Sequence, residues 1–396
     1  MQSNSALKLG DRLLGPIAFG LLGLHNVARR AVKPAYRSFE APTQSPNTVV
    51  VIKLCCLGDA LLAVPAIRAL ARRWPQSRLV LLCTPRSSPA FANLPFVDEL
   101  ISLPVTGLGD TWAALRRGQE VIGAVSKLRG YRAEVVVDLD LYFKTTPIIA
   151  YLTGAPVRAG FDTEGYNRAG LFTHAVPRDR DKWEAECFLD VVGAVGAPTD
   201  DRALEVHIGA DVRQAADQIL RARGLEQSDT FAVVCPGSSQ NWPSKQWPSH
   251  RFAEVIDWLQ QERGIPSVLV GASFEAGLCE EVASYAEAGV ECLAGETTVA
   301  EMAAILQRSA VLVTNDTGPL HLGVAVGTPV VAIFGPTNER KWGPRGPRDA
   351  VIFNENCDCR PCYYLSYMPD CEHRRCLDEI PASRVINAVN GIVDNL

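Results

Sequence analysis

The stretch Leu-Val-Thr-Asn-Asp-Thr-Gly-Pro-Leu-His at residues 312–321 decides the fold of this chain. Its apolar start predicts a buried strand, and Gly318-Pro319 then begins a helix that carries His321. Such a strand-to-helix corner presents backbone N–H groups and the positive end of a helix dipole, both of which suit a phosphate or diphosphate. A second apolar strand follows at 330–334. The two strands and their helix form a βαβ unit, which is typical of nucleotide-binding α/β domains.

The same alternation of apolar strands and amphipathic helices extends on both sides of this unit. A continuous apolar strand is expected at 49–54, and a helix at 60–74 has apolar residues at helical spacing and ends before Pro75. Further strands are expected at 79–83, 97–103, 134–139, 157–161, 231–235 and 267–270, and further helices at 111–128, 182–195, 212–223, 250–262, 275–286, 299–307 and 381–393. The pattern predicts an α/β protein of two doubly wound domains with a cleft between them.

Changes in polarity give the expected domain boundaries. They are an N-terminal extension and linker at 1–47, a first domain at 48–205, an interdomain region at 206–228, a second domain at 229–380 with a cysteine-rich segment at 357–376, and a C-terminal helix at 381–396.

The charge of the chain is unevenly distributed. The net charge over 396 residues is −5, and residues 1–47 carry six Lys/Arg against two acidic residues, which leaves −9 for the remainder. A chain of this charge lacks the basic face of a nucleic-acid-binding protein, so no nucleic-acid partner is expected.

The N-terminal extension combines an apolar run with basic residues. The run at 13–24 is too short to cross a bilayer, which needs about 20 residues. Because Arg29, Arg30, Lys33 and Arg37 follow it, the extension suits peripheral contact with an anionic membrane surface. The alternative is an extension that packs on the protein itself.

The twelve cysteines fall into two groups. Seven are scattered through apolar runs, as buried free thiols are, which favours a reducing cytoplasm. The others lie between 357 and 376, where Cys359, Cys362, Cys371 and Cys376 could hold a structural zinc ion. Disulfides or free thiols are the alternatives.

The first strand-to-helix corner contains Leu57-Gly58-Asp59. Ligands of open α/β sheets bind beyond the carboxyl ends of the strands, so Asp59 is a candidate general base. The competing interpretation is a helix N-cap, a position that aspartate favours. Since the corner has neither a G-x-G-x-x-G nor a Walker A pattern, it supports neither NAD nor a P-loop nucleotide.

The second domain opens with a corner that contains Ser238 and Ser239, and Lys245 follows. Hydroxyls can bond phosphate oxygens and an ammonium can supply charge, although each residue alone also suits an ordinary turn. Together with the corner at 315–318, they could face one anion.

Three acidic residues have two interpretations each. Glu301 fits a capping box with Thr298, or a contact to a ribose. Asp138 and Asp140 alternate at a strand end, a pattern that holds a divalent metal in some nucleotide-sugar enzymes and that also arises by chance.

Several short motifs in this order resemble those of a known family. They are Ile52-Lys53, Leu57–Leu62, Pro65–Arg68, Phe96–Glu99, Gly160–Asp162, Pro236–Ser238, Lys245–Pro248, Asn315–Leu322, Gly327–Pro329 and Phe334–Thr337. From about residue 49 to 390 the chain resembles glycosyltransferase family 9, the ADP-heptose:lipopolysaccharide heptosyltransferase-like enzymes.

The resemblance implies a GT-B fold, two Rossmann-like domains facing across a cleft, with the last helix returning to the first domain. It implies inverting transfer of a sugar, typically heptose from ADP-heptose, to a lipopolysaccharide core without a required cofactor. The implied partners are an ADP-sugar and a lipid-linked saccharide. The cysteine usage and the basic extension, which is not part of the family pattern, add the expectation of a cytoplasmic enzyme peripheral to the inner membrane.

The family's functional residues map onto positions of this chain. The resemblance makes Asp59 the catalytic aspartate and Glu301 the ribose contact, and it assigns the phosphate and sugar to the following residues: Ser238, Ser239, Lys245, Asp316, Thr317, Gly318 and His321. The chain departs from the family near 138, where many relatives have Asp-x-Gln-Gly, and Lys144 is the candidate contact to an anionic acceptor. A nucleotide-sugar epimerase or hydrolase, or a non-catalytic binding scaffold at the membrane, is the rival function.

Overall fold

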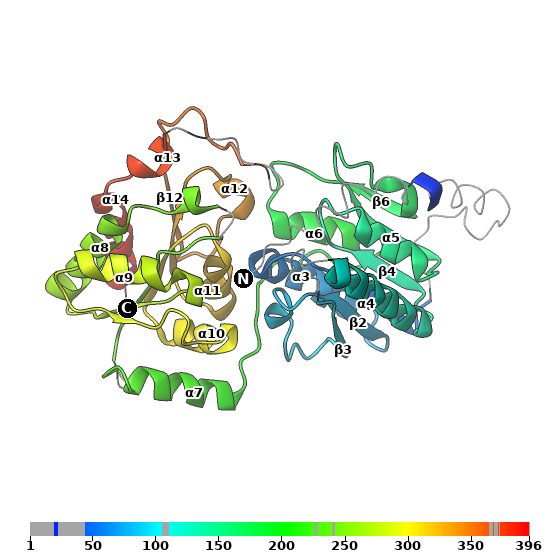
Figure 1. Ribbon diagram of the computed structural model, residues 1–396, viewed down its shortest axis with the longest axis horizontal. Helices are drawn as coiled ribbons and strands as arrows, with labels where there is room; N and C mark the ends of the chain where they lie inside the picture. The colour runs from blue at the N-terminus through cyan, green and yellow to red at the C-terminus, as the bar shows by residue number, and fades with distance from the viewer. Residues whose placement is uncertain are drawn as a thin grey trace. The chain divides into compact units, whose positions relative to one another are not determined.

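The computed structural model describes residues 20–22, 44–104, 111–225, 229–239, 242–363, 367, 371 and 373–395. The expectation of membrane contact by residues 1–47 therefore lies almost wholly outside the described residues. None of the helices within the described ranges is long and apolar enough to cross a membrane. The chain divides into two compact units, Met1–Ala203 and Leu204–Leu396 (Figure 1).

The first unit contains a parallel sheet of six strands in the order β3-β2-β1-β4-β5-β6. The strands are β1 (Thr48–Ile52), β2 (Arg78–Cys83), β3 (Glu99–Ser102), β4 (Val135–Asp138), β5 (Val157–Asp162) and β6 (His174–Pro177). Its helices are α3 (Leu57–Arg73), α4 (Thr111–Gly130), α5 (Thr145–Leu152) and α6 (Glu184–Gly193), with 3₁₀ turns at Ser88–Ala90 and Ala169–Leu171.

The second unit repeats this plan with the strand order β12-β11-β10-β7-β8-β9, again all parallel. The strands are β7 (Ala232–Cys235), β8 (Ser267–Leu269), β9 (Glu291–Cys292), β10 (Val311–Asn315), β11 (Val330–Phe334) and β12 (Ala350–Phe353). The helices are α7 (Ala210–Arg221), α8 (Ser249–Arg263), α9 (Ala276–Tyr285), α10 (Val299–Arg308), α11 (Gly318–Val326), α12 (Glu339–Trp342), α13 (Arg375–Asp378) and α14 (Ala382–Val393), and short 3₁₀ turns lie at Pro243–Lys245 and Ser273–Glu275.

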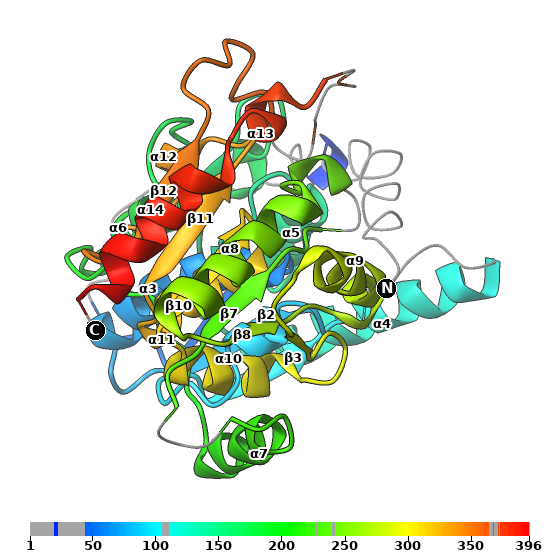
Figure 2. The same cartoon turned by 90° about the vertical axis from the view of Figure 1, so that its left-hand side faces the viewer.

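The cores explain why the strands are apolar on both faces. Every residue of β1, β10 and β11 is buried, because helices cover each sheet on two sides. In the first unit, Val50 and Ile52 pack with Ala124 and Leu128 of α4. In the second, α14 and α8 lie side by side over the sheet (Figure 2).

The fold class is confirmed, and the exceptions have physical reasons. Strands β6, β9 and β12 were not predicted because they are short edge strands with few buried side chains. The prediction that the last helix returns to the first domain is wrong, because α14 packs in the second unit. Val385 and Val389 of α14 belong to the core of the second unit.

Both sheets reverse their strand order beside the first strand of the unit. In the first unit the switch lies between β1 and β4, and in the second it lies between β7 and β10. Ligands of doubly wound sheets bind at such switch points, beyond the carboxyl ends of the strands. The topology therefore brings the corner at 53–59 next to 138–140, and the corner at 236–239 next to 315–318.

Two buried cations neutralise the carboxylates at the end of β4. The guanidinium of Arg168 donates to Asp138 Oδ2 at 2.6 Å and to the carbonyls of Phe143 and Asp140. The ammonium of Lys53 lies 3.6 Å from Asp140 Oδ1. All four side chains are at most 1% exposed. Burial raises the pKa of Asp138 to about 6, and Arg168 opposes this rise.

We expect Arg168→Met to lower the free energy of unfolding by about 3–5 kcal/mol, because the carboxylate of Asp138 would be buried without its cation. Urea denaturation measures this change. The control is Arg180→Met, since Arg180 forms an exposed pair with Glu164 and its loss should cost less than about 1 kcal/mol. Equal losses in the two variants would contradict the assignment.

Candidate active site

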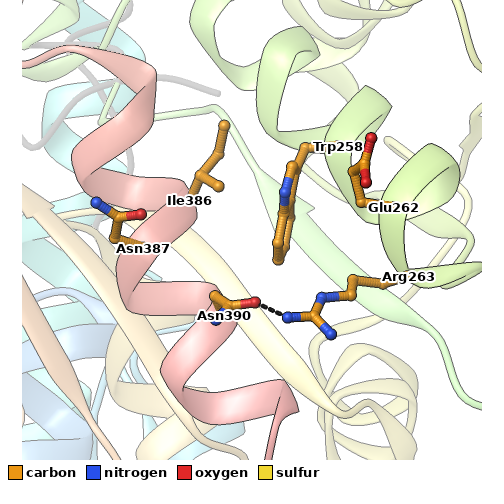
Figure 3. A pocket seen from close by; sticks show the side chains of 6 residues that line it. All are labelled: Trp258, Glu262, Arg263, Ile386, Asn387 and Asn390. Atoms are coloured by element: carbon orange, nitrogen blue, oxygen red, sulfur yellow. Dashed lines mark hydrogen bonds between the residues drawn. The ribbon is translucent and has the colours of Figure 1, made fainter.

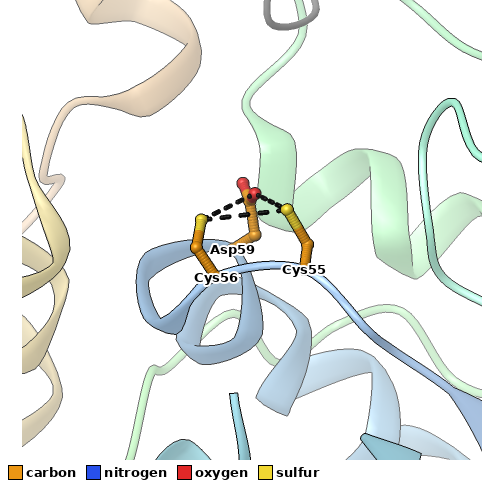
Figure 4. A group of neighbouring side chains, drawn as sticks. All are labelled: Cys55, Cys56 and Asp59. Atoms are coloured by element: carbon orange, nitrogen blue, oxygen red, sulfur yellow. Dashed lines mark hydrogen bonds between the residues drawn. The ribbon is translucent and has the colours of Figure 1, made fainter. Parts of the chain in front are cut away.

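Asp59 lies in the first turn of α3, and Cys55 and Cys56 lie between the end of β1 and the start of this helix. Cys56 is the N-cap of α3, so Asp59 is not the N-cap and that alternative is wrong. The Asp59 carboxylate accepts from Cys55 Sγ at 2.9 Å and from Cys56 Sγ at 3.2 Å (Figure 4). It is half-buried, so a small polar group can reach it.

Buried polar groups hold the backbone of this corner. Asp140 Oδ2 accepts from the backbone N–H of Leu54 at 2.8 Å, and Thr84 Oγ1 donates to the Leu54 carbonyl. The hydrogen bond with Cys56 and the burial of the thiol raise the pKa of Cys55 well above its usual range. Cys55 is therefore a protonated donor to Asp59 near neutral pH.

The structure does not support a divalent metal on Asp138 and Asp140. Both carboxylates are buried and paired with Arg168 and Lys53. They act as the anchors of the first corner. Lys144, the candidate acceptor contact, is half-buried at the N-cap of α5 and lies near this end of β4 in the sequence.

In the second unit, Asn315 joins the two corners of the switch point. Its Nδ2 donates to the carbonyls of Pro236 at 2.8 Å and Gly237 at 3.2 Å, and its Oδ1 accepts from the N–H of Trp247 at 3.1 Å. The end of β10 is therefore tied to the loop after β7 and to the segment after Lys245.

Lys245 and Asp316 meet at this junction. The ammonium donates to Asp316 Oδ2 at 2.9 Å and lies 4.6 Å from the centroid of the Tyr363 ring. Burial favours a higher pKa for Asp316, but Lys245 and other neighbours outweigh it and hold that pKa below its usual value. The carboxylate of Asp316 is therefore stabilised in its ionised form, and both side chains of the pair are mostly buried.

The hydroxyl candidates lie on the loop after β7. Ser238 is buried, and its Oγ donates to the carbonyl of Trp242 at 2.9 Å, while Ser239 is half-buried. Behind the loop lies Glu275, whose pKa burial raises and whose carboxylate accepts from the N–H of Ala272. A Cβ on Gly237 would overlap the carboxylate of Glu275, which would then have to move.

Helix α11 begins at the same place. Thr317 is its N-cap, Gly318 and Pro319 form its first turn, and the buried His321 follows one turn later. The first N–H groups of such a helix lack partners within the helix and favour an anion.

Glu301 forms the capping box that the sequence predicts. Its carboxylate accepts from the N–H of Thr298 at 2.7 Å, and its own N–H donates to Thr298 Oγ1 at 3.2 Å. The capping interpretation is confirmed, and the contact to a ribose stays a prediction.

The cysteine-rich segment gathers five thiols near one another. Cys357 and Cys359 have their sulfur atoms 3.4 Å apart, Cys357 and Cys376 are buried, and Cys359 and Cys371 are exposed. Burial raises the pKa of Cys376 to about 12, and the other four cysteines contribute to the rise. The segment also bonds the carbonyl of Pro336 through the N–H groups of Cys362 and Tyr363, which holds Tyr363 over Lys245.

A cavity of about 310 Å³ lies elsewhere in the second unit, between α8 and α14 (Figure 3). Its lining includes Trp258 and the guanidinium of Arg263, which lies 5.4 Å from the Trp258 ring centroid. No sequence-predicted site residue lines it.

Several positioning residues were not predicted from the sequence. Asn315 stands in the quoted motif, but its bonds to the loop after β7 depend on the strand order. Arg168 and Tyr363 act across sequence separations that no local pattern reveals. Glu275 accepts from the nearby N–H of Ala272 and also from the N–H of Ser238, on the distant loop after β7.

The sequence and the fold are similar to those of known proteins. A family model described as glycosyltransferase family 9 (heptosyltransferase) matches residues 123–367. Lipopolysaccharide heptosyltransferase 3 of Escherichia coli is 26% identical over 295 residues, covering 72% of this chain and 82% of that protein. Lipooligosaccharide heptosyltransferase 2 of Haemophilus influenzae is 30% identical over 317 residues, covering 77% and 88%. The structure of E. coli ADP-heptose lps heptosyltransferase II is similar, with a TM-score of 0.69, 20% identity and coverage of 88% and 99%.

Proposed function

The chain belongs to glycosyltransferase family 9, the heptosyltransferase family, and on this premise we propose that it transfers heptose from ADP-heptose to a lipopolysaccharide core. The transfer proceeds with inversion and uses no catalytic metal ion. The observation that carries the proposal is the ammonium of Lys245, held at the switch point of the second sheet beside the first turn of α11.

In the proposed reaction the second unit binds the ADP moiety. Lys245 and the N–H groups of α11 neutralise the diphosphate as it leaves, while Ser238 and Ser239 supply hydroxyls to phosphate oxygens. Asp316 orients Lys245, and with Thr317, Gly318 and His321 it contacts the phosphate and sugar.

Asp59 acts as the general base of the first unit. It takes the proton of the acceptor hydroxyl as that oxygen forms a bond to the anomeric carbon and the bond from that carbon to the ADP oxygen breaks. The thiols of Cys55 and Cys56 orient the carboxylate. Lys144 contacts an anionic group of the acceptor.

The test is a screen of ADP- and UDP-sugars against lipid-A-core, Kdo and polyprenyl acceptors, with mass detection. We expect an acceptor heavier by one heptosyl residue, together with ADP. Free sugar or an isomerised sugar with no acceptor consumed would favour the hydrolase or epimerase. Donor binding without turnover on any acceptor would favour the scaffold.

We expect Asp59→Asn to lower kcat by roughly 10²–10⁴ while the Kd for ADP stays unchanged, because only proton transfer loses its base. Steady-state kinetics and calorimetry measure the two quantities. Asp211→Asn is the control, since Asp211 also lies in the first turn of a helix. Turnover that survives in Asp59→Asn would refute the role of this residue.

Lys245→Met should weaken ADP binding by roughly ten- to a hundredfold, since a hydrogen bond to a charged group contributes about 1.5–3 kcal/mol. Isothermal titration with ADP measures it. Lys182→Met, which removes another Lys–Asp pair, is the matched control and should leave the affinity unchanged. An unchanged Kd in Lys245→Met would remove this residue from the phosphate site.

The ribose contact of Glu301 is tested by Glu301→Gln. Glutamine keeps the capping box, so we expect the melting temperature to hold while the affinity for ADP falls. Equal affinity would leave Glu301 with the capping role alone.

A structural zinc ion on Cys359, Cys362, Cys371 and Cys376 is the proposed role of the cysteine-rich segment. The support for it is that Cys359, Cys362 and Cys371 each lie near enough to Cys376 to raise its pKa. We expect Cys359→Ser/Cys362→Ser to remove one equivalent of zinc by elemental analysis. An unchanged zinc content would contradict the site.

The composition of residues 1–47 supports peripheral contact of this cytoplasmic enzyme with the inner membrane. We expect the full chain to sediment with anionic vesicles more than with neutral ones, and deletion of residues 1–40 to abolish the difference. Equal sedimentation before and after the deletion would refute the contact.

A further inference from the structure

Three potential metal ligands converge at the corner between β1 and α3. Cys55 Sγ, Cys56 Sγ and a carboxylate oxygen of Asp59 lie within 4.8 Å of one another, and no other group of three or more such ligands occurs among the described residues. Figure 4 shows the three side chains pointing toward one another from one short segment. The proposed transfer reaction uses the two thiols only as hydrogen-bond donors that orient the carboxylate.

The spacing of the two sulfur atoms suits a tetrahedral ion. Two thiolates that each lie about 2.3 Å from zinc are about 3.8 Å apart in a tetrahedron. The sulfur atoms of Cys55 and Cys56 are 3.8 Å apart. A carboxylate oxygen in the same tetrahedron would lie about 3.5 Å from each sulfur. The present separations of 2.9 and 3.2 Å are those of hydrogen bonds to Asp59, so the carboxylate needs to move by only a few tenths of an ångström.

The corner is also held in place and open to an ion. The carboxylate of Asp140 fixes the backbone N–H of Leu54, one residue before the thiols, at 2.8 Å. Cys56 and Asp59 are half-buried, so an ion can enter from the side of Asp59. Three protein ligands leave a fourth position for water, which is the arrangement of open zinc sites.

We propose that Cys55, Cys56 and Asp59 form a binding site for one thiophilic divalent cation such as Zn²⁺, and that the bound ion inhibits sugar transfer. Binding replaces the two S–H···O hydrogen bonds to Asp59 by two Zn–S bonds and one Zn–O bond, and the two thiol protons pass to solvent. The charges of two thiolates, one carboxylate and the ion sum to −1, and the buried ammonium of Lys53, which is paired with Asp140, also interacts electrostatically with Asp59, Cys55 and Cys56. The inhibition rests on the proposed role of Asp59 as the base, whereas the binding does not.

Cobalt binding tests the site without reference to catalysis. The full chain with Cys359→Ser/Cys362→Ser is the starting protein, so that the cysteine-rich segment does not contribute. We expect one equivalent of Co²⁺ to give the near-ultraviolet absorption of thiolate-bound cobalt, and Zn²⁺ to displace it. Adding Cys55→Ser/Cys56→Ser should abolish the absorption, whereas adding Cys292→Ser, which removes another half-buried thiol, should leave it. Equal absorption in all three proteins would overturn the proposal.

Zinc inhibition tests the consequence for the reaction. Because loss of even an outer partner of a metal site costs roughly 10–100-fold in affinity, we expect Cys55→Ser/Cys56→Ser to raise the half-inhibitory zinc concentration by at least about 100-fold. Each protein is compared with its own zinc-free rate, and EDTA should restore that rate. If the protein shows the cobalt absorption but no transfer activity, the proposed function is refuted and the metal site is supported. If the protein transfers the sugar but shows no cobalt absorption, the metal site is refuted and the proposed function is supported.

Discussion

The two buried cations at the end of β4 are the constraint on which the first corner depends. Arg168 and Lys53 allow two carboxylates to lie in the core at the switch point, where an unpaired charge would be prohibitively costly. One of these carboxylates, that of Asp140, then holds the N–H of Leu54. The electrostatics of the core thereby set the position of the thiols and of Asp59, whose carboxylate is the reactive group in the proposed mechanism.

In the second unit, an amide side chain and one ion pair hold the strand ends at the switch point. Asn315 bonds both the loop after β7 and the segment that follows Lys245, so the strand ends are joined by a neutral side chain. The charge is concentrated in the Lys245–Asp316 pair, which is shielded by Tyr363. Because this ammonium is already paired and mostly desolvated, the diphosphate of the proposed mechanism would meet a fixed positive group and not a mobile surface lysine.

Much of this arrangement could be predicted from the sequence, because it follows from local patterns. The apolar strands, the helices at 60–74 and 381–393, the capping box at Glu301 and the two strand-end corners are all short-range features. The motif that begins at Asn315 also predicts the family, which the match over residues 123–367 confirms. The partners of Asp138 and Asp140 could not be predicted from the sequence. Two aspartates that alternate at a strand end are compatible both with metal binding and with pairing to Arg168. The pairing of β1 with β4 brings Lys53 beside Asp140, and Arg168 reaches Asp138 from the loop after β5. The short edge strands bury few side chains, so their sequences lack the run of apolar residues that predicts a strand.

The central claim is that one carboxylate, Asp59, serves a single displacement at the anomeric carbon. The most direct test is the anomeric configuration of the new glycosidic bond in the product, determined by NMR. A single displacement predicts that the product has the configuration opposite to that of the donor sugar. A product that retains the donor configuration would contradict the account, because retention requires an intermediate that a lone general base does not provide.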